Sequence, residues 1–258
     1  MRPILVIGDS IRDIYIYGRV GGIANEDPVL RFIPNGEKKI IEGGANFVQR
    51  AIATYSPVPV PLVSTSISTI VRYVDKNYSR NVFTVDNTEQ ILLSSPEDLL
   101  PLIEQNPKII VIWDDMRNPD LSEGIRSFLR KIILSGKLSD TLIIVDSADP
   151  DWNSPSIVHY QKMSIDEYRK IGLLPLYANH IITSSSTVIL NKNGVAQHFK
   201  VQTVENPIDT TGAGDIFLAM FTACLYNKLS DETAIRKAIR YSTESVKYHG
   251  CFIPPESL

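Results

Sequence analysis

Short apolar runs alternate with amphipathic segments along most of the chain. Four aliphatic runs, typical of buried strands, lie at residues 4–7, 109–112, 142–145 and 180–182. Helical spacing of apolar positions occurs between them, for example in residues 121–134. Strands that alternate with helices favour a mostly parallel sheet with helices on both faces. We therefore expect an α/β fold.

The residues that follow these runs indicate where a site would lie. The first run ends in Gly8-Asp9, which predicts a strand that leads into a turn. Asp114 follows the second run and Asp146 follows the third. Ligands of open parallel sheets bind at the carboxyl ends of the strands, so both aspartates stand where a site residue would be expected.

Two further segments show a different pattern. Residues 14–33 and 68–94 are rich in Tyr, Val and Arg and alternate in polarity, as half-exposed strands do. We interpret them as a small sheet that projects from the main one. The proline-rich residues 56–61 predict a stiff connection.

Length and charge narrow the class of protein. The chain has 258 residues, which suits one α/β domain spanning residues 1–258. Its 26 basic and 29 acidic residues give a net charge of −3. This charge does not create the positive electrostatic field that would attract nucleic acid or an anionic membrane surface. The longest apolar run, within residues 216–226, is too short to span a bilayer, and no signal peptide is visible. Cys224 and Cys251 give no disulfide framework, so we expect a cytoplasmic protein.

A glycine-rich turn carries the clearest chemistry. Residues 209–215 read DTTGAGD and open directly onto an apolar helix. The first amides of a helix lack intrahelical partners and carry the positive end of its dipole, so the turn predicts an anion site. Asp215 would take a proton from a hydroxyl there. The structural alternative is that Thr211 caps the helix and Asp215 is an ordinary first-turn acid. Neither the P-loop nor the dinucleotide-binding pattern fits.

The complete heptad resembles the D-T-x-G-A-G-D signature of the ribokinase/PfkB family of sugar kinases. This resemblance implies a ribokinase-like α/β fold, with a mostly parallel central sheet flanked by helices and a small β lid made from residues 14–33 and 68–94. It implies that Asp215 is the catalytic base. It also implies that an anion hole is formed by the amides of Gly212, Ala213 and Gly214.

A second match lies in the N-terminal part. Residues 42–47 read EGGANF, which is similar to the G-G-x-x-N segment that holds sugar hydroxyls in the family, together with an early aspartate. By this resemblance the acceptor would be bound by Asp13, Gly43, Gly44 and Asn46. Taken alone, Asn46 would be interpreted as a helix-capping residue.

Within the family, the opening is most similar to the heptose-7-phosphate kinase branch. GDSIRDIYIYG matches its G-D-x-x-x-D-x-Y-x-x-G pattern, and EGGANF is similar to its P-G-G-A-A-N. Ser79-Arg80-Asn81 resembles a segment whose basic side chains meet the substrate phosphate. The resemblance gives that role to Arg80 and to Arg72 upstream, and each is equally interpretable as a solvated charge.

Several family features are missing from this chain. An edge β-α-β unit is absent, because the chain passes from Tyr55 through residues 56–61 almost directly to the second lid segment. The N-x-x-E motif linked to magnesium keeps Glu167 but has Ser164 in place of its asparagine. No lysine follows Asp146. The chain therefore resembles a shortened member of the family.

The expected nucleotide side also departs from the family pattern. The T-x-G-x-x-G turn reads TSSST at residues 183–187, without glycines, and YSTE replaces a small alanine-rich stretch at residues 241–244. The resemblance gives nucleotide-binding roles to Thr183, Ser185, Thr210, Thr211 and Ser242. Glu167 is expected to contact Mg²⁺ through water.

Two functions follow from these motifs. The first is an ATP- and Mg²⁺-dependent phosphotransferase that phosphorylates a hydroxyl of a sugar or sugar phosphate, of the heptose-7-phosphate type. The second is a catalytically weakened or inactive relative that keeps the fold for binding or assembly. A nucleoside kinase of the same fold fits the opening less well. The resemblance also implies a possible homodimer through the lid, which would cover its exposed edges.

Overall fold

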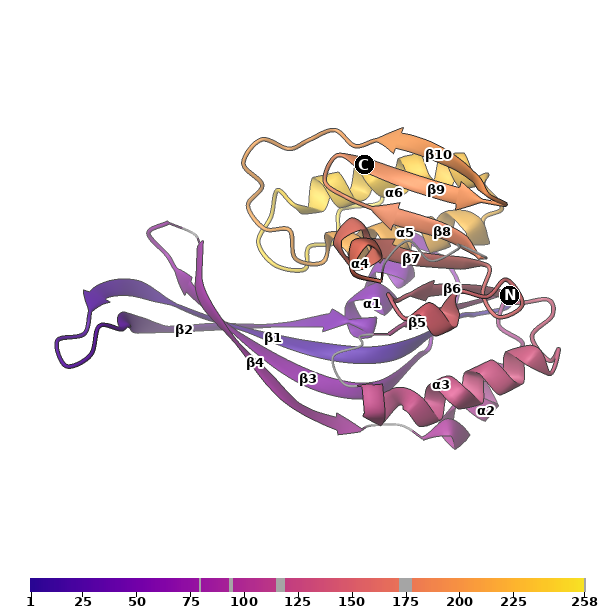
Figure 1. Ribbon diagram of the computed structural model, residues 1–258, viewed down its shortest axis with the longest axis horizontal. Coiled ribbons are helices and arrows are strands. Elements are labelled where there is room, and N and C mark those ends of the chain that lie inside the picture. The colour runs from indigo at the N-terminus through magenta and orange to yellow at the C-terminus, as the bar shows by residue number, and fades with distance from the viewer. Residues whose placement is uncertain (79, 93–94, 115–118, 172–177, 258) are drawn as a thin grey trace.

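The computed structural model describes residues 1–78, 80–92, 95–114, 119–171 and 178–257. Residues 79 and 93–94 of the second predicted lid segment therefore lie outside the described part. The strands are β1 (Ile4–Ile23), β2 (Leu30–Gly44), β3 (Leu62–Asp75), β4 (Arg80–Leu92), β5 (Ile109–Trp113), β6 (Leu142–Asp146), β7 (Tyr160–Ser164), β8 (Asn179–Thr183), β9 (Thr187–Lys192) and β10 (Val195–Lys200). They form one sheet in the order β10-β9-β8-β7-β6-β5-β1-β3-β4, with β2 paired to β1 (Figure 1).

The centre of this sheet is parallel. Strands β3, β1, β5, β6, β7 and β8 run in the same direction, and β9 and β10 continue the edge in antiparallel pairing. Successive side chains of β1 point to opposite faces: Ile4 and Val6 enter one apolar core, and Leu5 and Ile7 enter the other. Both cores are necessary because a parallel sheet is buried on its two faces.

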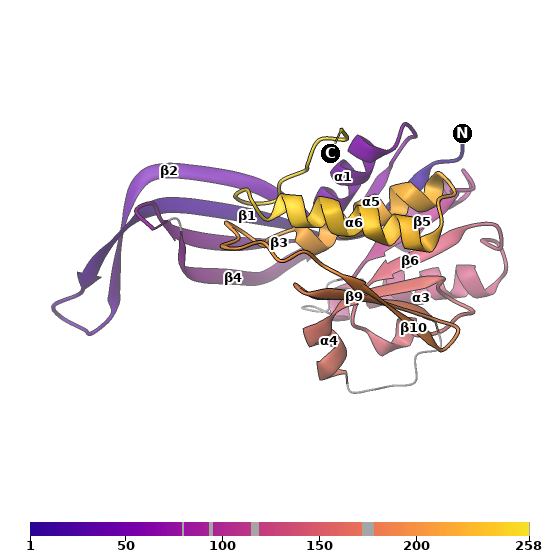
Figure 2. The same cartoon turned by 90° about the horizontal axis from the view of Figure 1, so that it is seen from above.

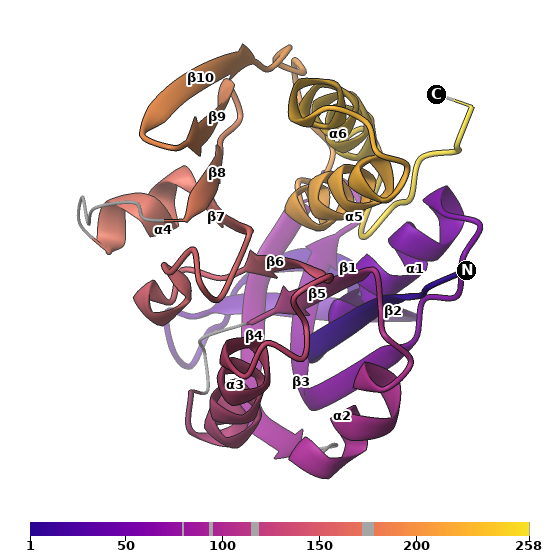
Figure 3. The same cartoon turned by 90° about the vertical axis from the view of Figure 1, so that its right-hand side faces the viewer.

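Helices cover each face, as Figure 3 shows. The helices are α1 (Ala45–Tyr55), α2 (Pro96–Ile103), α3 (Pro119–Leu134), α4 (Ile165–Lys170), α5 (Ala213–Tyr226) and α6 (Asp231–Ser245), with a 3₁₀ turn η1 at Pro150–Trp152. Helices α1, α5 and α6 pack on one face, and α2 and α3 pack on the other. No helix among the described residues is long and apolar enough to cross a membrane. This is the α/β arrangement that the apolar pattern predicts.

Strand β1 is much longer than its apolar run. The sequence predicts a strand that stops at Gly8-Asp9, and this prediction is wrong because β1 continues to Ile23. A shift in the β1–β3 pairing lies between Gly8 and Ser10, so the chain passes this point as a bulge instead of a turn. Glycine is required there, since a Cβ on Gly8 would stand 2.0 Å from the carbonyl oxygen of Trp113.

The distal halves of four strands form a blade that projects from the main sheet (Figures 1 and 2). In this lid β1 pairs with β2 on one side and with β3 on the other, and β3 pairs with β4. Rings of Phe32, Tyr73 and Phe83 pack together within it. The described parts of the segments predicted as the lid therefore lie side by side.

The long strand β3 takes the place of the missing edge unit, because it belongs both to the central sheet and to the lid. Its first residues extend the central sheet, from the pair Val6 and Leu62, and its last ones belong to the lid, up to the pair Gly18 and Asp75. The proline-rich connection runs beside β1, because the amides of Ile4 and Val6 donate to the carbonyls of Pro59 and Pro61. One continuous strand thus replaces a separate unit.

Candidate active site

The glycine-rich turn begins helix α5 in the core of the molecule. Helix α5 is buried from Ile216 to Cys224, so the packing that fixes it also fixes its first turn. Its N-cap is Gly212, with φ 79° and ψ 0° and no side-chain cap. The structural alternative of a Thr211 cap is therefore wrong. The turn is held instead by Asp209, whose carboxylate accepts hydrogen bonds from the amides of Thr211 (2.9 Å) and Gly250 (2.9 Å).

The three predicted anion-hole residues have different surroundings. The amide of Ala213 already donates to the carbonyl of Thr210, over a long 3.3 Å. A Cβ on Gly212 would stand 2.8 Å from Phe47 Cε1, so this glycine is required by packing and by its positive φ. A Cβ on Gly214 would stand 3.2 Å from Lys162 Nζ. Only Gly214 therefore keeps open the space beside a cation.

Asp215 lies in the first turn of α5 and is partly buried. The indole Nε1 of Trp113, at the end of β5, donates to its Oδ1 (2.9 Å). Burial raises the pKa of Asp215 to about 7, the charge of Asp146 adds to this, and Lys162 and the Trp113 hydrogen bond oppose it. A carboxylate with this pKa changes its protonation near neutral pH, as a general base requires.

Lys162 is a site residue that the sequence did not reveal. It lies on β7 with its side chain 8% exposed, and its Nζ donates to Asp146 Oδ2 (2.6 Å). Burial opposes the ammonium, but the charge and hydrogen bond of Asp146 outweigh it and raise the pKa of Lys162. The lysine that is missing after Asp146 in the sequence is thus supplied from the neighbouring strand. The signal was a lysine inside an otherwise buried strand.

The predicted acceptor residues converge beside this turn. Gly43 faces Asp13, because a Cβ on Gly43 would lie 3.3 Å from Asp13 Oδ2. Gly44 is the N-cap of α1 at φ 61° without a side-chain cap, so Asn46 does not cap the helix. Asp13 is close enough to Asp215 for its charge to raise the pKa of that carboxyl.

Arg72 has a structural partner within this group. Its Nε donates to Asp13 Oδ1 (2.7 Å), and the guanidinium lies 6.0 Å from the centre of the Tyr15 ring. The guanidinium of Arg72 thus holds the carboxylate of Asp13, and its contact with a substrate phosphate stays a prediction. Arg80 is different, since it is exposed and lines a small cavity of about 140 Å³ together with Tyr17, Asp209 and His249.

Tyr15 also lines this small cavity. Its side chain is buried, and its hydroxyl has no hydrogen-bond partner among the described residues. Burial, together with the charges of Asp209 and Asp13, raises the pKa of the Tyr15 phenol, so it stays protonated. A buried hydroxyl of this kind needs a partner and can donate to a ligand. From the sequence, Tyr15 is predicted only to lie on a strand whose residues alternate in polarity.

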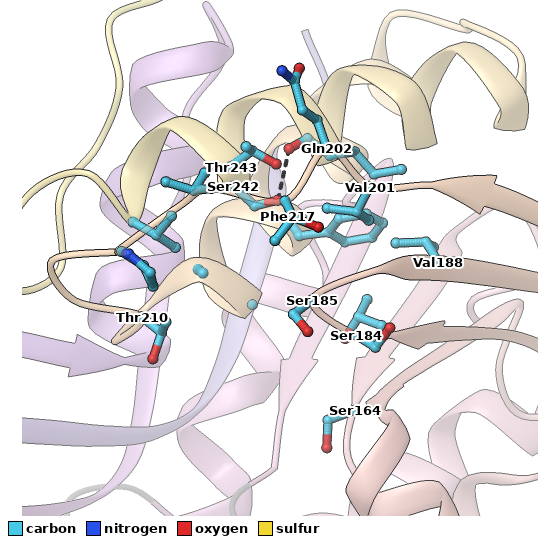
Figure 4. Close-up of a pocket in the computed structure, with 18 of the residues that line it drawn as sticks. Ser164, Ser184, Ser185, Val188, Val201, Gln202, Thr210, Phe217, Ser242 and Thr243 are labelled. Atoms are coloured by element: carbon cyan, nitrogen blue, oxygen red, sulfur yellow. Dashed lines mark hydrogen bonds between the residues drawn. The ribbon is translucent and has the colours of Figure 1, made fainter.

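A larger cavity, of about 590 Å³, lies on the other side of the α5 N-terminus. Its walls combine apolar side chains with hydroxyls, as Figure 4 shows, with Val188, Val201 and Phe217 between the serines of the β8–β9 turn and Ser242 and Thr243 of α6. Lys162 and Gly214 line it as well. An apolar cavity with a few polar groups and a cation at one end suits an aromatic ligand with an anionic tail.

Four of the five predicted nucleotide residues line this cavity: Thr183, Ser185, Thr210 and Ser242. Thr211 is not among the lining residues, since its amide is bound to Asp209. The hydroxyl of Ser242 donates to the carbonyl of Ile239 (3.1 Å), the dashed line in Figure 4. The glycine-free turn is closed by Ser184, whose Oγ accepts from the amides of Ser186 and Thr187.

Glu167 forms the capping box of α4. Its carboxylate accepts from the Ser164 amide (2.7 Å), and Ser164 Oγ accepts from the Glu167 amide (3.2 Å). Glu167 is exposed, and its charge acts on the pKa of Lys162 and Asp146, so it lies at the edge of the site. The described residues contain no cluster of three His, Cys, Asp or Glu side chains that would hold a metal by themselves.

Comparisons with known proteins agree with this architecture. Residues 166–258 match the family described as pfkB family carbohydrate kinase. The bifunctional protein HldE of Helicobacter pylori (strain Shi470) is 22% identical over 280 aligned residues, covering 89% of this chain and 59% of that protein. The chain thus spans about 59% of the length of this curated relative.

Solved structures show the same fold over the whole chain. A ribokinase from Thermotoga maritima gives a TM-score of 0.70 at 17% identity, with 100% of this chain and 97% of that one covered. An Arabidopsis thaliana ribokinase, complexed with ribose and ATP, gives 0.64 at 14% identity, with 99% and 96% covered. Fold and site therefore define a ribokinase-like α/β protein, which confirms the predicted fold class. Residues 166–258 are thus similar to the pfkB family of carbohydrate kinases.

Proposed function

We propose that this protein is a kinase that transfers a phosphoryl group from ATP to a hydroxyl of a sugar or sugar phosphate. The observation that carries the proposal is a partly buried carboxylate with a pKa of about 7, Asp215, in the first turn of a helix whose residues Ala213 and Gly214 line a cavity. A positioned base and an anion-binding helix end are the two parts that such a transfer needs.

In this mechanism Asp215 accepts the proton of the acceptor hydroxyl while that oxygen forms its bond to phosphorus. The bond from phosphorus to the bridging oxygen breaks, and the leaving diphosphate departs with its electron pair. The first-turn amides of α5, chiefly that of Gly214, donate to the phosphoryl oxygens. Lys162 holds its ammonium next to the same place, because Asp146 keeps it charged and oriented. Mg²⁺, when bound, would neutralise phosphate charge, with Glu167 contacting it through water.

The larger cavity is proposed to hold the nucleotide. Apolar side chains of the β9 strand and α5 would cover the base, and the hydroxyls of Thr183, Ser185 and Thr210 would donate to polar groups. Support comes from the shape of the cavity, which leads from an apolar end to Lys162 and Gly214. The ATP in the related Arabidopsis ribokinase complex supports the same choice of donor.

The acceptor is proposed to lie between the lid and the first turn of α5. Asp13, Gly43, Gly44 and Asn46 would bind its hydroxyls. Arg80 lines the small cavity at the lid, where a substrate phosphate would meet its guanidinium. A heptose-7-phosphate-like acceptor is supported by the GDSIRDIYIYG opening, which retains the early aspartate and tyrosine of that branch.

Asp215→Asn tests the proposal. The amide fits the same space but cannot accept a proton, so turnover should fall by about a hundredfold to ten-thousandfold. Nucleotide affinity, measured by thermal shift with ATP and ADP, should change little. The assay uses a panel of sugars and sugar phosphates with ATP and Mg²⁺, and Asp166→Asn, at an exposed position, serves as the control. Wild-type protein that binds nucleotide and turns over no acceptor would favour the inactive binding or assembly protein.

The lid is also proposed to carry a homodimer interface. Directly paired residues share one face of a sheet, and Ile40, Ile14, Val71 and Val85 form such a row across the four lid strands. Ile40 and Val85 are 55% and 47% exposed. Asp13 and Tyr15 alternate with Ile14 and therefore point to the opposite, acceptor-side face. An apolar outer face on a projecting sheet suits a second copy of the same surface.

A further inference from the structure

Trp113 connects the two halves of the candidate site. It ends β5, and its Nε1 donates to Asp215 Oδ1 over 2.9 Å. On the acceptor side, its Cζ3 would be 3.2 Å from a Cβ on Gly44. The indole therefore extends from the carboxylate to the glycine pair at the start of α1. Its backbone also explains Gly8, where a side chain would collide with the Trp113 carbonyl.

An indole has one donor and no acceptor. Its N–H donates most strongly to an oxygen that carries no proton, so it disfavours protonation of the bound Oδ1. When Asp215 takes up a proton, the hydrogen bond to Oδ1 favours Oδ2 as the oxygen that receives it. The indole thereby selects both the orientation of the carboxylate and the oxygen that exchanges the proton.

We propose that Trp113 is the positioning residue of Asp215: its N–H holds Oδ1, leaves Oδ2 to take the acceptor proton, and its ring forms the wall of the acceptor site next to Gly44. This inference rests on the proposed function, because it assigns the base an orientation for that reaction. Trp113 acts through Asp215 and does not itself exchange a proton.

The charges around Asp215 set the expected pH response. Asp13 of β1, Asp146 of β6 and the Cys251 thiol after α6 face it, together with the ammonium of Lys162 from β7. Burial and Asp146 raise the pKa of Asp215, and the indole hydrogen bond lowers it. Loss of the indole N–H should therefore raise this pKa further. The acid limb of kcat/KM should move to higher pH, because the base works only when it is ionised.

The chain offers a spectroscopic readout, since Trp113 and Trp152 are its only two tryptophans. Trp152 is fully buried and donates to Asp114 (2.8 Å), away from Asp215. Tryptophan emission is therefore to be titrated from about pH 5 to 9 in wild type, Asp215→Asn and Trp113→Phe, without substrate. Wild-type emission should change with a midpoint near the pKa of Asp215, about 7. Both variants should lack that transition, and Trp113→Phe reports the remaining Trp152 signal.

Kinetics provide the second arm. Trp113→Phe keeps a smaller aromatic ring but loses the donor, so kcat should fall by about tenfold or more, with the KM for ATP changed less than about twofold. Tyr160→Phe is the matched control, because it removes a hydrogen bond to Asp231 (2.7 Å) remote from the base. Its pH profile should match that of wild type.

The outcomes separate the two claims. An active wild type whose emission titrates equally in Asp215→Asn would overturn the inference, as would an unmoved acid limb in Trp113→Phe. Wild type without turnover on any sugar or sugar phosphate would instead reject the proposed function. The emission titration would then still decide whether Trp113 senses Asp215.

Discussion

At the residue scale, the pKa of Asp215 depends on the few charged and polar side chains that surround it. Lys162 and Asp146 are ion-paired at 2.6 Å, and the indole of Trp113 supplies a neutral donor. Among the described residues no cation forms an ion pair with Asp215, so this partly buried carboxylate is costly to ionise, and burial accordingly raises its pKa to about 7. The same cost of ionisation that raises this pKa also acts on the stability of the fold.

Asp215→Asn should therefore stabilise the protein more at pH 8 than at pH 5. Between about pH 4 and 7 the native state keeps a proton that the unfolded chain has released, so the free energy of unfolding falls as pH rises through this window. Asparagine is neutral throughout and escapes this loss. A gain of about 1–2 kcal/mol at pH 8 would raise the Tm by roughly 2–8 °C. Thermal unfolding at both pH values measures it.

The control for this prediction is Asp166→Asn, since the Asp166 side chain is 79% exposed. It should leave the pH dependence of the Tm unchanged. An Asp215→Asn variant whose Tm differs from that of wild type by the same amount at both pH values would contradict the raised pKa of Asp215.

At the element scale, the two glycines at the start of α5 have different roles. Gly212 has the left-handed backbone and packs against Phe47, whereas Gly214 is inside the helix and borders Lys162. The D-T-x-G-A-G-D pattern gives both glycines the same anion-hole role. The structure distinguishes them: Gly212 is needed for the fold, and Gly214 is needed to leave space beside the Lys162 ammonium.

Gly212→Ala should lower stability and Gly214→Ala should lower function. A Cβ at Gly212 meets Phe47 Cε1 at 2.8 Å and adopts a backbone that costs about 1–2 kcal/mol outside glycine. Alanine at 214 suits a helix but approaches Lys162 Nζ to 3.2 Å, which should weaken ATP binding more than ADP binding. Thermal unfolding and nucleotide titrations compare the two variants.

Gly124→Ala is the matched control within a helix, because nothing lies within 4 Å of its added Cβ. It should retain nucleotide affinity and gain slightly in stability. The assignment would be wrong if Gly212→Ala kept the wild-type Tm while Gly214→Ala lost it without a change in the relative affinity for ATP and ADP.

At the scale of the whole molecule, the lid and the central sheet are parts of the same strands. β1 and β3 run from the apolar core into the projecting blade (Figure 1), so a second molecule bound to the lid would be connected directly to Asp13 and Arg72 in the site. The outer face of the blade is apolar along the row from Ile40 to Val85.

Val85→Glu should convert a lid-mediated dimer into a monomer. A carboxylate buried in an apolar interface has no partner there, and its desolvation costs several kcal/mol. Size-exclusion chromatography with light scattering measures the mass over a dilution series. Thr84→Glu, on the opposite face of the same strand, is the control and should keep the wild-type mass. A wild type that is monomeric at every concentration would contradict the proposed interface.

The sequence alone predicted the features that rest on local patterns. Apolar runs and helical spacing identified the parallel sheet and its helices, and DTTGAGD identified the start of α5 with Asp215 in its first turn. These succeed because hydrophobic periodicity and glycine placement act over a few neighbouring residues. Resemblance to a known signature suggested acceptor-binding roles for Asp13, Gly43 and Gly44, and these stay predictions.

Tertiary structure decided the features that join distant parts of the chain. Trp113 and Asp215 are 102 positions apart, and Lys162 reaches Asp146 across neighbouring strands, 16 positions away. The continuation of β1 past Gly8 likewise depends on pairing with β2 and β3, which outweighs the local turn signal. The pKa of Asp215 follows from these contacts and from burial. Burial and cross-strand neighbours are properties of the folded sheet, so no window of sequence contains them.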